Sequence, residues 1–114
     1  MESSRRSVPH GGLRLIAAER ERQVEAEGWT PEHDDQHRHG LLALAAASYA
    51  TPPYYRRLRK SDDTDEMVPD TWPEWWPWKP SPENRIRELT KAGALIAAEI
   101  DRLQRAHPNE SRRS

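Results

Sequence analysis

Apolar residues recur at helical spacing in the first half of the chain. Between residues 13 and 27 they fall on one side of a helix, and Gly28 supplies the usual helix exit. Thr, Pro and Glu at residues 30–32 follow in the order of an N-cap, a first-turn proline and a first-turn acid. The pattern predicts a second helix that starts there and ends near Ala50, before Pro52.

A third helix is predicted over residues 81–103, where Ser, Pro and Glu repeat the start signal. Its apolar positions alternate spacings of three and four, the period of a helix-packing seam: Ile86, Leu89, Gly93, Ile96, Ile100 and Leu103. Gly93 would cost about 1 kcal/mol relative to alanine inside a helix. We therefore expect a close neighbour against Gly93, and the tryptophan-rich segment is the candidate. The seam also offers a surface through which copies of the chain associate.

The rest of the chain lacks helical periodicity. Residues 51–70, basic and then acidic, predict a flexible insertion, and residues 1–12 and 108–114 predict disordered tails because they have almost nothing to bury. The expected fold class is all-α. We predict a small bundle of about three helices in one domain over residues 13–107, with an extended strap packed across the third helix.

Composition narrows the classes of protein that this pattern allows. The chain has 114 residues, 34% hydrophobic and 32% charged, so it fits one small domain with a limited core. Its 18 Lys plus Arg nearly balance 19 Asp plus Glu, so nucleic acid is not an expected partner. The absence of cysteine, of a signal-like N-terminus and of an apolar run longer than residues 41–47 predicts a cytoplasmic protein without a membrane partner.

Residues 71–80, "TWPEWWPWKP", hold four of the five tryptophans of the chain. The prolines keep this segment out of a regular helix or central strand and predict an extended strap. Three interpretations of the tryptophans stay open. They fill the small core, they form an aromatic platform for a nucleotide-like ligand whose phosphate meets Lys79 and Arg85, or they present a patch to a protein partner.

The stretch "HDDQHRH", which starts at His33, gathers histidines and aspartates at the start of the second predicted helix. His33 and His37 have the spacing of two metal ligands on one helix face, and Asp35 and His39 have the same spacing. No third ligand is readable and no Glu follows His33, so we predict neither a metal site nor a cofactor. Asp34 and Asp35 would instead meet the helix dipole or pair with an arginine or an indole N–H.

An enzyme is the main alternative to a binding protein. Helical nucleotide pyrophosphohydrolases of the MazG type hold Mg²⁺ with clustered acids, and this chain resembles them in size and class. In that reading five carboxylates would converge on Mg²⁺ and a water: Glu21, Glu25, Asp34, Asp35 and Glu99. The chain departs from the E-x-x-E spacing of that family, because Val24 follows Glu21 by three residues. No nucleophile with a base is readable either, so we expect no catalytic residues.

Three blocks of sequence carry a resemblance to known proteins: "ERERQVEAEGWTPEHDDQH", "WPEWWPWKP" and "RELTKAGALIAAEIDRL". From Glu19 to Leu103 the chain resembles a group of short, uncharacterised proteins that are common in bacteriophage and prophage genomes. The resemblance implies a phage-derived accessory protein in the host cytoplasm. It does not imply an activity.

A more distant resemblance is to the RyR domain, a small helical module of ryanodine receptors that also occurs in bacterial and phage proteins. The residues that follow the order of its pattern are Gly28, Trp29, Asp34, Asp35, Lys79 and Arg85. The chain departs from that domain by lacking a His-Pro-x-Leu stretch after the acids and by carrying the tryptophan strap instead. The resemblance implies a binding module rather than an enzyme.

Residue patterns and resemblances together predict a non-catalytic binding module for a small nucleotide-like ligand or a host protein. The predicted ligand-binding residues are Trp29, His33, Asp34, Asp35, Trp76, Trp78, Lys79 and Arg85. Two alternatives stay open. One is the metal-dependent nucleotide pyrophosphohydrolase, and the other is a structural subunit that forms a homo-oligomer through residues 86–103.

Overall fold

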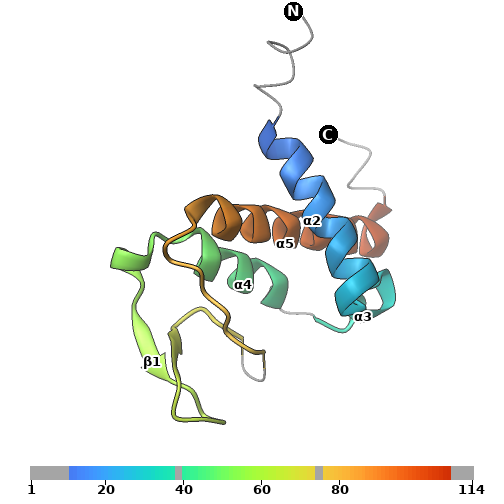
Figure 1. Cartoon of the computed structure of the whole chain (residues 1–114). Coiled ribbons are helices and arrows are strands. Elements are labelled where there is room, and N and C mark those ends of the chain that lie inside the picture. Colours follow the sequence, from blue (N-terminus) through green and yellow to red (C-terminus); the bar gives the residue numbers. More distant parts are fainter. Residues whose placement is uncertain (1–10, 38–39, 74–75, 109–114) are drawn as a thin grey trace, which may run out of the picture.

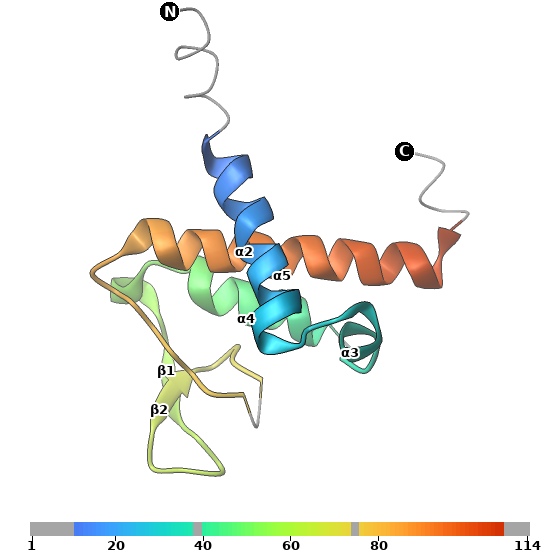
Figure 2. The ribbon, with the colours of Figure 1, turned by 45° about the vertical axis from the view of Figure 1, so that its right-hand side comes forward.

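The computed structural model describes residues 11–37, 40–73 and 76–108 of the chain. Within them the element order is α2 (Gly11–Glu27), α3 (Pro31–Asp35), α4 (Leu41–Ala50), the 3₁₀ helix η2 (Pro53–Tyr55), β1 (Leu58–Lys60), β2 (Met67–Pro69) and α5 (Arg85–Ala106). α4 packs along α5, and α2 crosses α5 steeply, as Figures 1 and 2 show. The hairpin of β1 and β2 lies beyond α4, on the side away from the start of α2 (Figure 2).

The core lies between α4 and α5. Alanines on both helices let the two backbones come close, and Leu42 and Leu95 are their largest fully buried aliphatic side chains. Tyr49 and Trp72, each 5% exposed, close the core on the side of the strap. The strap, residues 71–80, therefore supplies part of the core of this small domain. The buried apolar residues are Leu42, Ala45, Ala46, Tyr49, Val68, Trp72, Ala92, Ala94, Leu95 and Ala98.

The predicted apolar seam of α5 faces away from this core. The predicted helical period is correct, but the large side chains of the seam are exposed, from 42% for Leu103 to 69% for Ile86. The core face of α5 is the alanine-rich one, because small residues let α4 lie close to it. The exposed seam residues are Ile86, Leu89, Ile96, Ile100 and Leu103.

Gly93 has the close neighbour that its position predicts, but that neighbour belongs to α2. A Cβ at Gly93 would lie 2.7 Å from Cγ1 of Ile16, so the helices can cross here because residue 93 has no side chain. The prediction that the tryptophan segment covers Gly93 is therefore wrong. The crossing instead brings the second half of α2 alongside the core, where it forms one wall of a cavity.

The all-α prediction is wrong, because residues 58–69 contain a two-stranded antiparallel sheet. Leu58 pairs with Pro69, and Val68 between the paired ends is only 4% exposed. This buried valine anchors the hairpin on the core, and most of the acidic residues that suggested a flexible insertion lie on its exposed turn, residues 62–66. Of the basic residues, Arg56 has a buried side chain that pairs with Glu88. The described part of the chain is mostly helical, with four α-helices and this hairpin.

The second predicted helix is divided into α3 and α4. Thr30 caps α3 as predicted, because its Oγ1 accepts the His33 N–H at 3.3 Å. Gly40, with a φ of 75°, precedes α4 in the left-handed conformation that glycine adopts readily. Since α3 stops at Asp35, the following His37 leaves the helix and packs against Trp76 of the strap.

The predicted tails lie mostly outside the described residues, as do His39 and Trp75. Gly11 and Gly12, which were expected in the first tail, belong to α2. None of the helices in the described ranges is long and apolar enough to cross a membrane.

Candidate functional site

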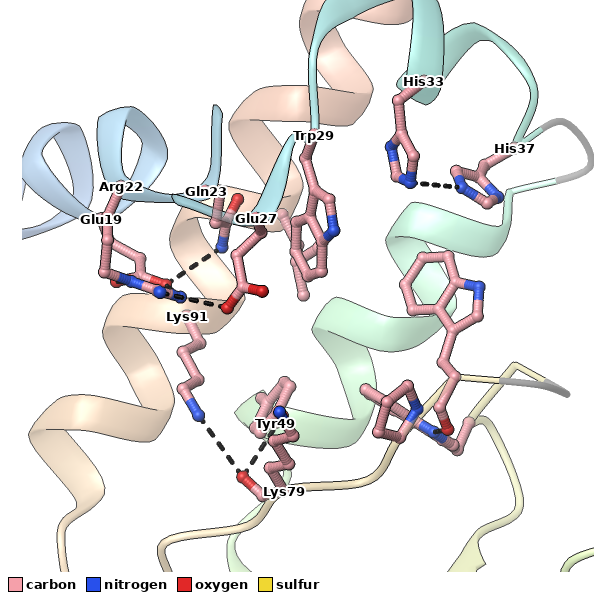
Figure 3. Close-up of a pocket in the computed structure, with 14 residues that line it drawn as sticks. Glu19, Arg22, Gln23, Glu27, Trp29, His33, His37, Tyr49, Lys79 and Lys91 are labelled. Atoms are coloured by element: carbon pink, nitrogen blue, oxygen red, sulfur yellow. Dashed lines mark hydrogen bonds and ion pairs between the residues drawn. The ribbon is translucent and has the colours of Figure 1, made fainter. Parts of the chain in front are cut away.

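A cavity of about 290 Å³ lies where α2, α3, α4 and α5 meet the strap (Figure 3). Aromatic side chains form one part of its lining: Trp29, His33, His37, Tyr49, Trp72 and Trp76. Polar side chains of α2, with one lysine each from the strap and α5, form another part: Glu19, Arg22, Gln23, Glu27, Lys79 and Lys91. Pro77 and Leu95 also contribute. Elements that are far apart in the sequence thus build one cavity.

The aromatic side chains of the cavity are fixed against one another. Trp29 stacks on His33, with ring planes 1° apart and centroids 5.9 Å apart, and its ring lies 6.2 Å from that of Trp76. Tyr49 meets Trp72 edge to face at 5.4 Å. The Trp72 Nε1–H donates to Trp76 O at 2.8 Å and ties the strap together. The aromatic walls are therefore positioned before any ligand binds.

At another end of the cavity, the backbone carbonyl of Lys79 receives two donors. The Tyr49 hydroxyl donates to it at 3.3 Å and the Lys91 ammonium at 3.4 Å (Figure 3). Burial lowers the pKa of Lys91, and the positive charge of Arg87 lowers it further. Burial raises the pKa of Tyr49 to about 12, so its hydroxyl stays neutral. Neither lysine ammonium is paired with a carboxylate of the described residues.

The acids of the cavity are neutralised by arginines. Glu19, 4% exposed, accepts hydrogen bonds from Arg22 at 2.9 Å and from Arg87 at 2.6 Å. Burial alone would raise the pKa of Glu19, but these two arginines outweigh it and hold that pKa below its ordinary value. Glu27 accepts a hydrogen bond from Arg22 at 3.1 Å. The surplus positive charge of the lining therefore rests on the two lysines.

Gln23 brings a buried acceptor to the cavity wall. It is 2% exposed, and its Nε2 donates to Glu19 Oε2 at 3.3 Å. Because a carboxylate can only accept, this bond fixes which end of the amide is nitrogen. Gln23 Oε1 is buried and has no hydrogen-bond partner among the described residues. Because this oxygen has almost no accessible surface, an N–H donor of a bound molecule would reach it only after the Gln23 side chain moves.

The two histidines of the lining face each other. His37 Nε2 lies 3.2 Å from His33 Nε2, and His33 Nδ1 lies 3.2 Å from Asp34 Oδ1. Asp34 is fully buried and forms an ion pair with Arg20, which also donates to Trp29 O at 3.3 Å. Burial lowers the pKa of His37, and the neighbouring His33 lowers it further. Asp34 thus holds the His33 ring from the side opposite His37.

Half of the predicted ligand-binding residues line the cavity: Trp29, His33, Trp76 and Lys79. Asp34 supports His33 without lining the cavity itself. Asp35 points elsewhere and forms an ion pair with Arg105 at 2.7 Å. Of the tryptophans in the strap, Trp72 packs in the core and also lines the cavity. The tryptophans can therefore fill the core and form an aromatic platform at the same time.

Trp78 and Arg85, also predicted to bind ligand, support α4 instead. Trp78 packs 4.9 Å from Tyr49, and the guanidinium of Arg56 lies 5.2 Å over its ring. Arg85 donates to Tyr49 O at 3.0 Å, and both arginines pair with the buried Glu88. The arginines thereby satisfy carbonyls at the C-terminal end of α4 and fix the wall that carries Tyr49.

Sequence reasoning missed most of the polar lining, above all Gln23 and Lys91. Glu19, Gln23 and Glu27 are spaced four residues apart on α2 and therefore share one side of that helix. Lys91 precedes the core residue Leu95 by four positions on α5. These spacings are readable signals, but they point to a common site only once the crossing of α2 and α5 is known.

The carboxylates that a hydrolase would need do not gather around this cavity. Glu21 and Glu25 are exposed on α2, and Glu99 pairs with Arg102 at 2.7 Å. Asp34 and Asp35 pair with two further arginines. In the described part of the chain, no group of three or more histidines and carboxylates is placed to hold a metal ion.

Comparisons of the chain with protein-family models, with curated proteins and with solved structures found no match. The resemblances to phage proteins and to the RyR domain therefore stay predictions from the sequence.

Proposed function

We propose that the protein is a non-catalytic binding module whose cavity holds a small nucleotide-like ligand, a planar base linked to an anionic group. The proposal rests on the separation of aromatic and positively charged side chains within the cavity lining. Trp29 and Trp76 supply aromatic surface at one side, and the ammonium groups of Lys79 and Lys91 supply charge at another. Indole rings stack on bases of any kind, and lysine binds phosphate as a point charge.

The size of the cavity suits a single nucleotide unit. Its volume of about 290 Å³ is close to the lower end of the usual range for small-molecule sites, about 300–1,000 Å³. Figure 3 shows open space bounded by Trp29, Tyr49 and Lys91. A planar ring would lie against Trp29, and its anionic substituent would extend toward Tyr49 and the lysines.

Gln23 favours a base that carries an amino group. The exocyclic amine of adenine, cytosine or guanine would donate to its Oε1 once a movement of the side chain opens that buried oxygen to the cavity. Hypoxanthine and uracil present a carbonyl oxygen where adenine and cytosine carry that amine. This carbonyl oxygen and Gln23 Oε1 are both acceptors and would repel each other. We therefore expect AMP to bind more tightly than IMP.

The alternatives differ in the support that the geometry gives them. The hydrolase has little, because the acids it requires are dispersed or paired with arginines. The structural oligomer has the exposed seam of α5 in its favour, and a host protein would dock on the same apolar surface. Sedimentation of the full chain as a monomer alone would remove the oligomer and leave the binding module untouched.

The proposal extends to the cellular role, a phage-type accessory protein that acts in the cytoplasm of the host cell. Of the residues that carry the RyR resemblance, Trp29 and Lys79 line the cavity, and Asp34 orients His33 beside it. Arg85 supports α4. If this protein binds its ligand as the RyR domain does, the residues that contact the ligand would therefore be Trp29 and Lys79.

The test is calorimetric titration of the full chain with AMP, IMP, ATP and adenosine, with inorganic phosphate and pyrophosphate measured in the same samples. We expect saturable binding of AMP, weaker binding of IMP and adenosine, and no product. If none of the four compounds binds saturably, the proposed function is wrong. Release of pyrophosphate or phosphate from ATP would replace the binding module with the hydrolase.

A further inference from the structure

His33 and His37 place two imidazole nitrogens side by side at the cavity wall. Their Nε2 atoms are 3.2 Å apart, and both rings line the cavity (Figure 3). Two nitrogen ligands of one tetrahedral metal ion each lie about 2.0–2.1 Å from it, which sets them a similar distance apart. The observed spacing therefore suits a shared cation as well as a hydrogen bond.

The inclination of the two rings argues against a strong hydrogen bond between them. Imidazoles that pointed their Nε2 atoms straight at each other would separate their centroids by the N–N distance plus a ring radius on each side. The observed centroid separation is only 4.5 Å, with ring planes 64° apart, so the Nε2 lone pairs are inclined to the line between them. Inclination weakens a hydrogen bond, and a small rotation of the rings would let both lone pairs converge on one ion.

Asp34 prepares His33 for this role. Its carboxylate accepts from His33 Nδ1, so the proton sits on Nδ1 and Nε2 presents a lone pair. The ion pair with Arg20 holds the carboxylate in position. A carboxylate on the far ring nitrogen is the common support of a metal-binding histidine.

We propose that His33 and His37 chelate a divalent transition metal of the zinc, nickel and copper class through their Nε2 atoms. Imidazole ligands select this class over Mg²⁺ and Ca²⁺, which prefer oxygen. Within the described ranges, no third histidine or carboxylate joins the pair. The remaining coordination positions therefore open on the cavity, where solvent or a bound molecule fills them.

The chelate is tested on the full chain with metal alone, through quenching of tryptophan fluorescence by Ni²⁺ and its reversal by Zn²⁺. Trp29 stacks on His33, and Trp76 meets His37 edge to face at 4.9 Å, so Ni²⁺ bound between the histidines would quench both indoles. The five histidines of the chain allow two reciprocal proteins. One carries Gln at His33 and His37, and the other carries Gln at the remaining three: His10, His39 and His107.

We expect the protein that keeps the pair to bind Ni²⁺ within about twofold of the wild type, and the protein without the pair to bind it at least about tenfold more weakly. Equal affinities of the two proteins would overturn the site. Long-range ¹⁵N spectra of the wild-type histidines need no substitution and guard against misfolded variants. Zn²⁺ should shift the Nε2 resonances of His33 and His37 together, and shifts confined to other histidines would overturn the assignment.

The outcomes separate this inference from the proposed function. Ni²⁺ binding that depends on the pair, without binding of any nucleotide, supports the chelate and contradicts the proposed function. AMP binding without Ni²⁺ binding at the pair does the reverse. Binding of AMP together with Ni²⁺ binding that depends on the pair supports both proposals.

Discussion

The Lys91 ammonium lies 5.1 Å from the centroid of the Tyr49 ring, and both side chains donate to the carbonyl oxygen of Lys79. This contact joins α4, α5 and the strap at the end of the cavity where we expect the anionic group. The aromatic face stabilises the partly buried ammonium, whose pKa burial lowers. The same contact thus holds α4, α5 and the strap together and positions the Lys91 ammonium at the cavity.

Replacing Lys91 with Met keeps most of the apolar stem and removes the charge. We expect AMP binding to weaken about tenfold, because a phosphate contact is lost, while adenosine binding stays within about twofold. Calorimetric titration of both ligands measures the difference. Lys60→Met, in the exposed hairpin, is the matched control and should leave both affinities unchanged. Equal losses for AMP and adenosine would contradict a phosphate contact at Lys91.

Replacing Gln23 with Leu tests the acceptor at the cavity wall. The variant removes the unpaired Oε1, and Glu19 keeps its arginine partners, so the free energy of unfolding should change by less than about 1 kcal/mol. We expect the wild type to prefer AMP over IMP by about tenfold and the variant to lose that preference. Gln36→Leu, at an exposed position, is the control. If the Gln23 variant still preferred AMP over IMP by the same factor, the amino group of adenine would not contact Gln23.

Glu88 should make stability depend on acid pH. It accepts hydrogen bonds from Arg56 at 2.9 Å, Arg85 at 2.6 Å and the Ser81 N–H at 2.9 Å. Burial alone would raise its pKa, but the two arginines and the Ser81 N–H outweigh burial and hold the pKa below the ordinary value of 4.5. The carboxylate therefore stabilises the fold fully above pH 4.5 and loses that contribution as the pH falls through the folded-state pKa.

Glu88→Gln should lower the free energy of unfolding at pH 7 by about 3 kcal/mol, because it leaves the buried guanidinium of Arg56 and the partly buried one of Arg85 without their carboxylate. The variant should also lose less stability than the wild type between pH 7 and about pH 3. Urea unfolding across this pH range measures both effects. Glu83→Gln, at an exposed position before α5, should behave like the wild type. Parallel pH curves for Glu88→Gln and the wild type would refute the assignment.

Gly93 and Ile16 should be energetically coupled. Gly93→Ala alone should destabilise the protein by about 1 kcal/mol or more, because the new methyl group overlaps Cγ1 of Ile16 and the gain in helix propensity does not offset that overlap. In an Ile16→Ala background the same change should stabilise α5. A double-mutant cycle by thermal unfolding measures the coupling. Additive effects would mean that the helices do not cross at this point.

The local structure of the helices could be predicted from the sequence in large part. The N-cap at Thr30, the glycine exit at Gly28 and the tight crossing at Gly93 all depend on residue types with strong backbone preferences. The start of α5 is displaced from the predicted position because Asn84, and not Ser81, caps it by accepting the Arg87 N–H. Local signals give the existence of an element more securely than its boundary.

The site could be predicted only in part, because it depends on how helices cross. Trp29, His33, Trp76 and Lys79 were expected from residue chemistry and line the cavity. Arg85 has the same chemistry, yet it caps α4, since the nearest unsatisfied carbonyls belong to that helix. The seam of α5 was expected to be buried. Helical period gives the spacing of a face, but the side chains of the partner helix decide which face is covered.

The most direct test of the binding module is an NMR titration of the five tryptophan indole N–H groups with AMP. We predict saturable shifts of the Trp29 and Trp76 resonances, with a smaller effect on Trp78, which lies outside the cavity lining. Titration of Lys91→Met should show the same shifts at higher AMP concentration. Indole resonances that do not move with AMP, or that move without saturating, would contradict the proposal that this cavity binds a nucleotide.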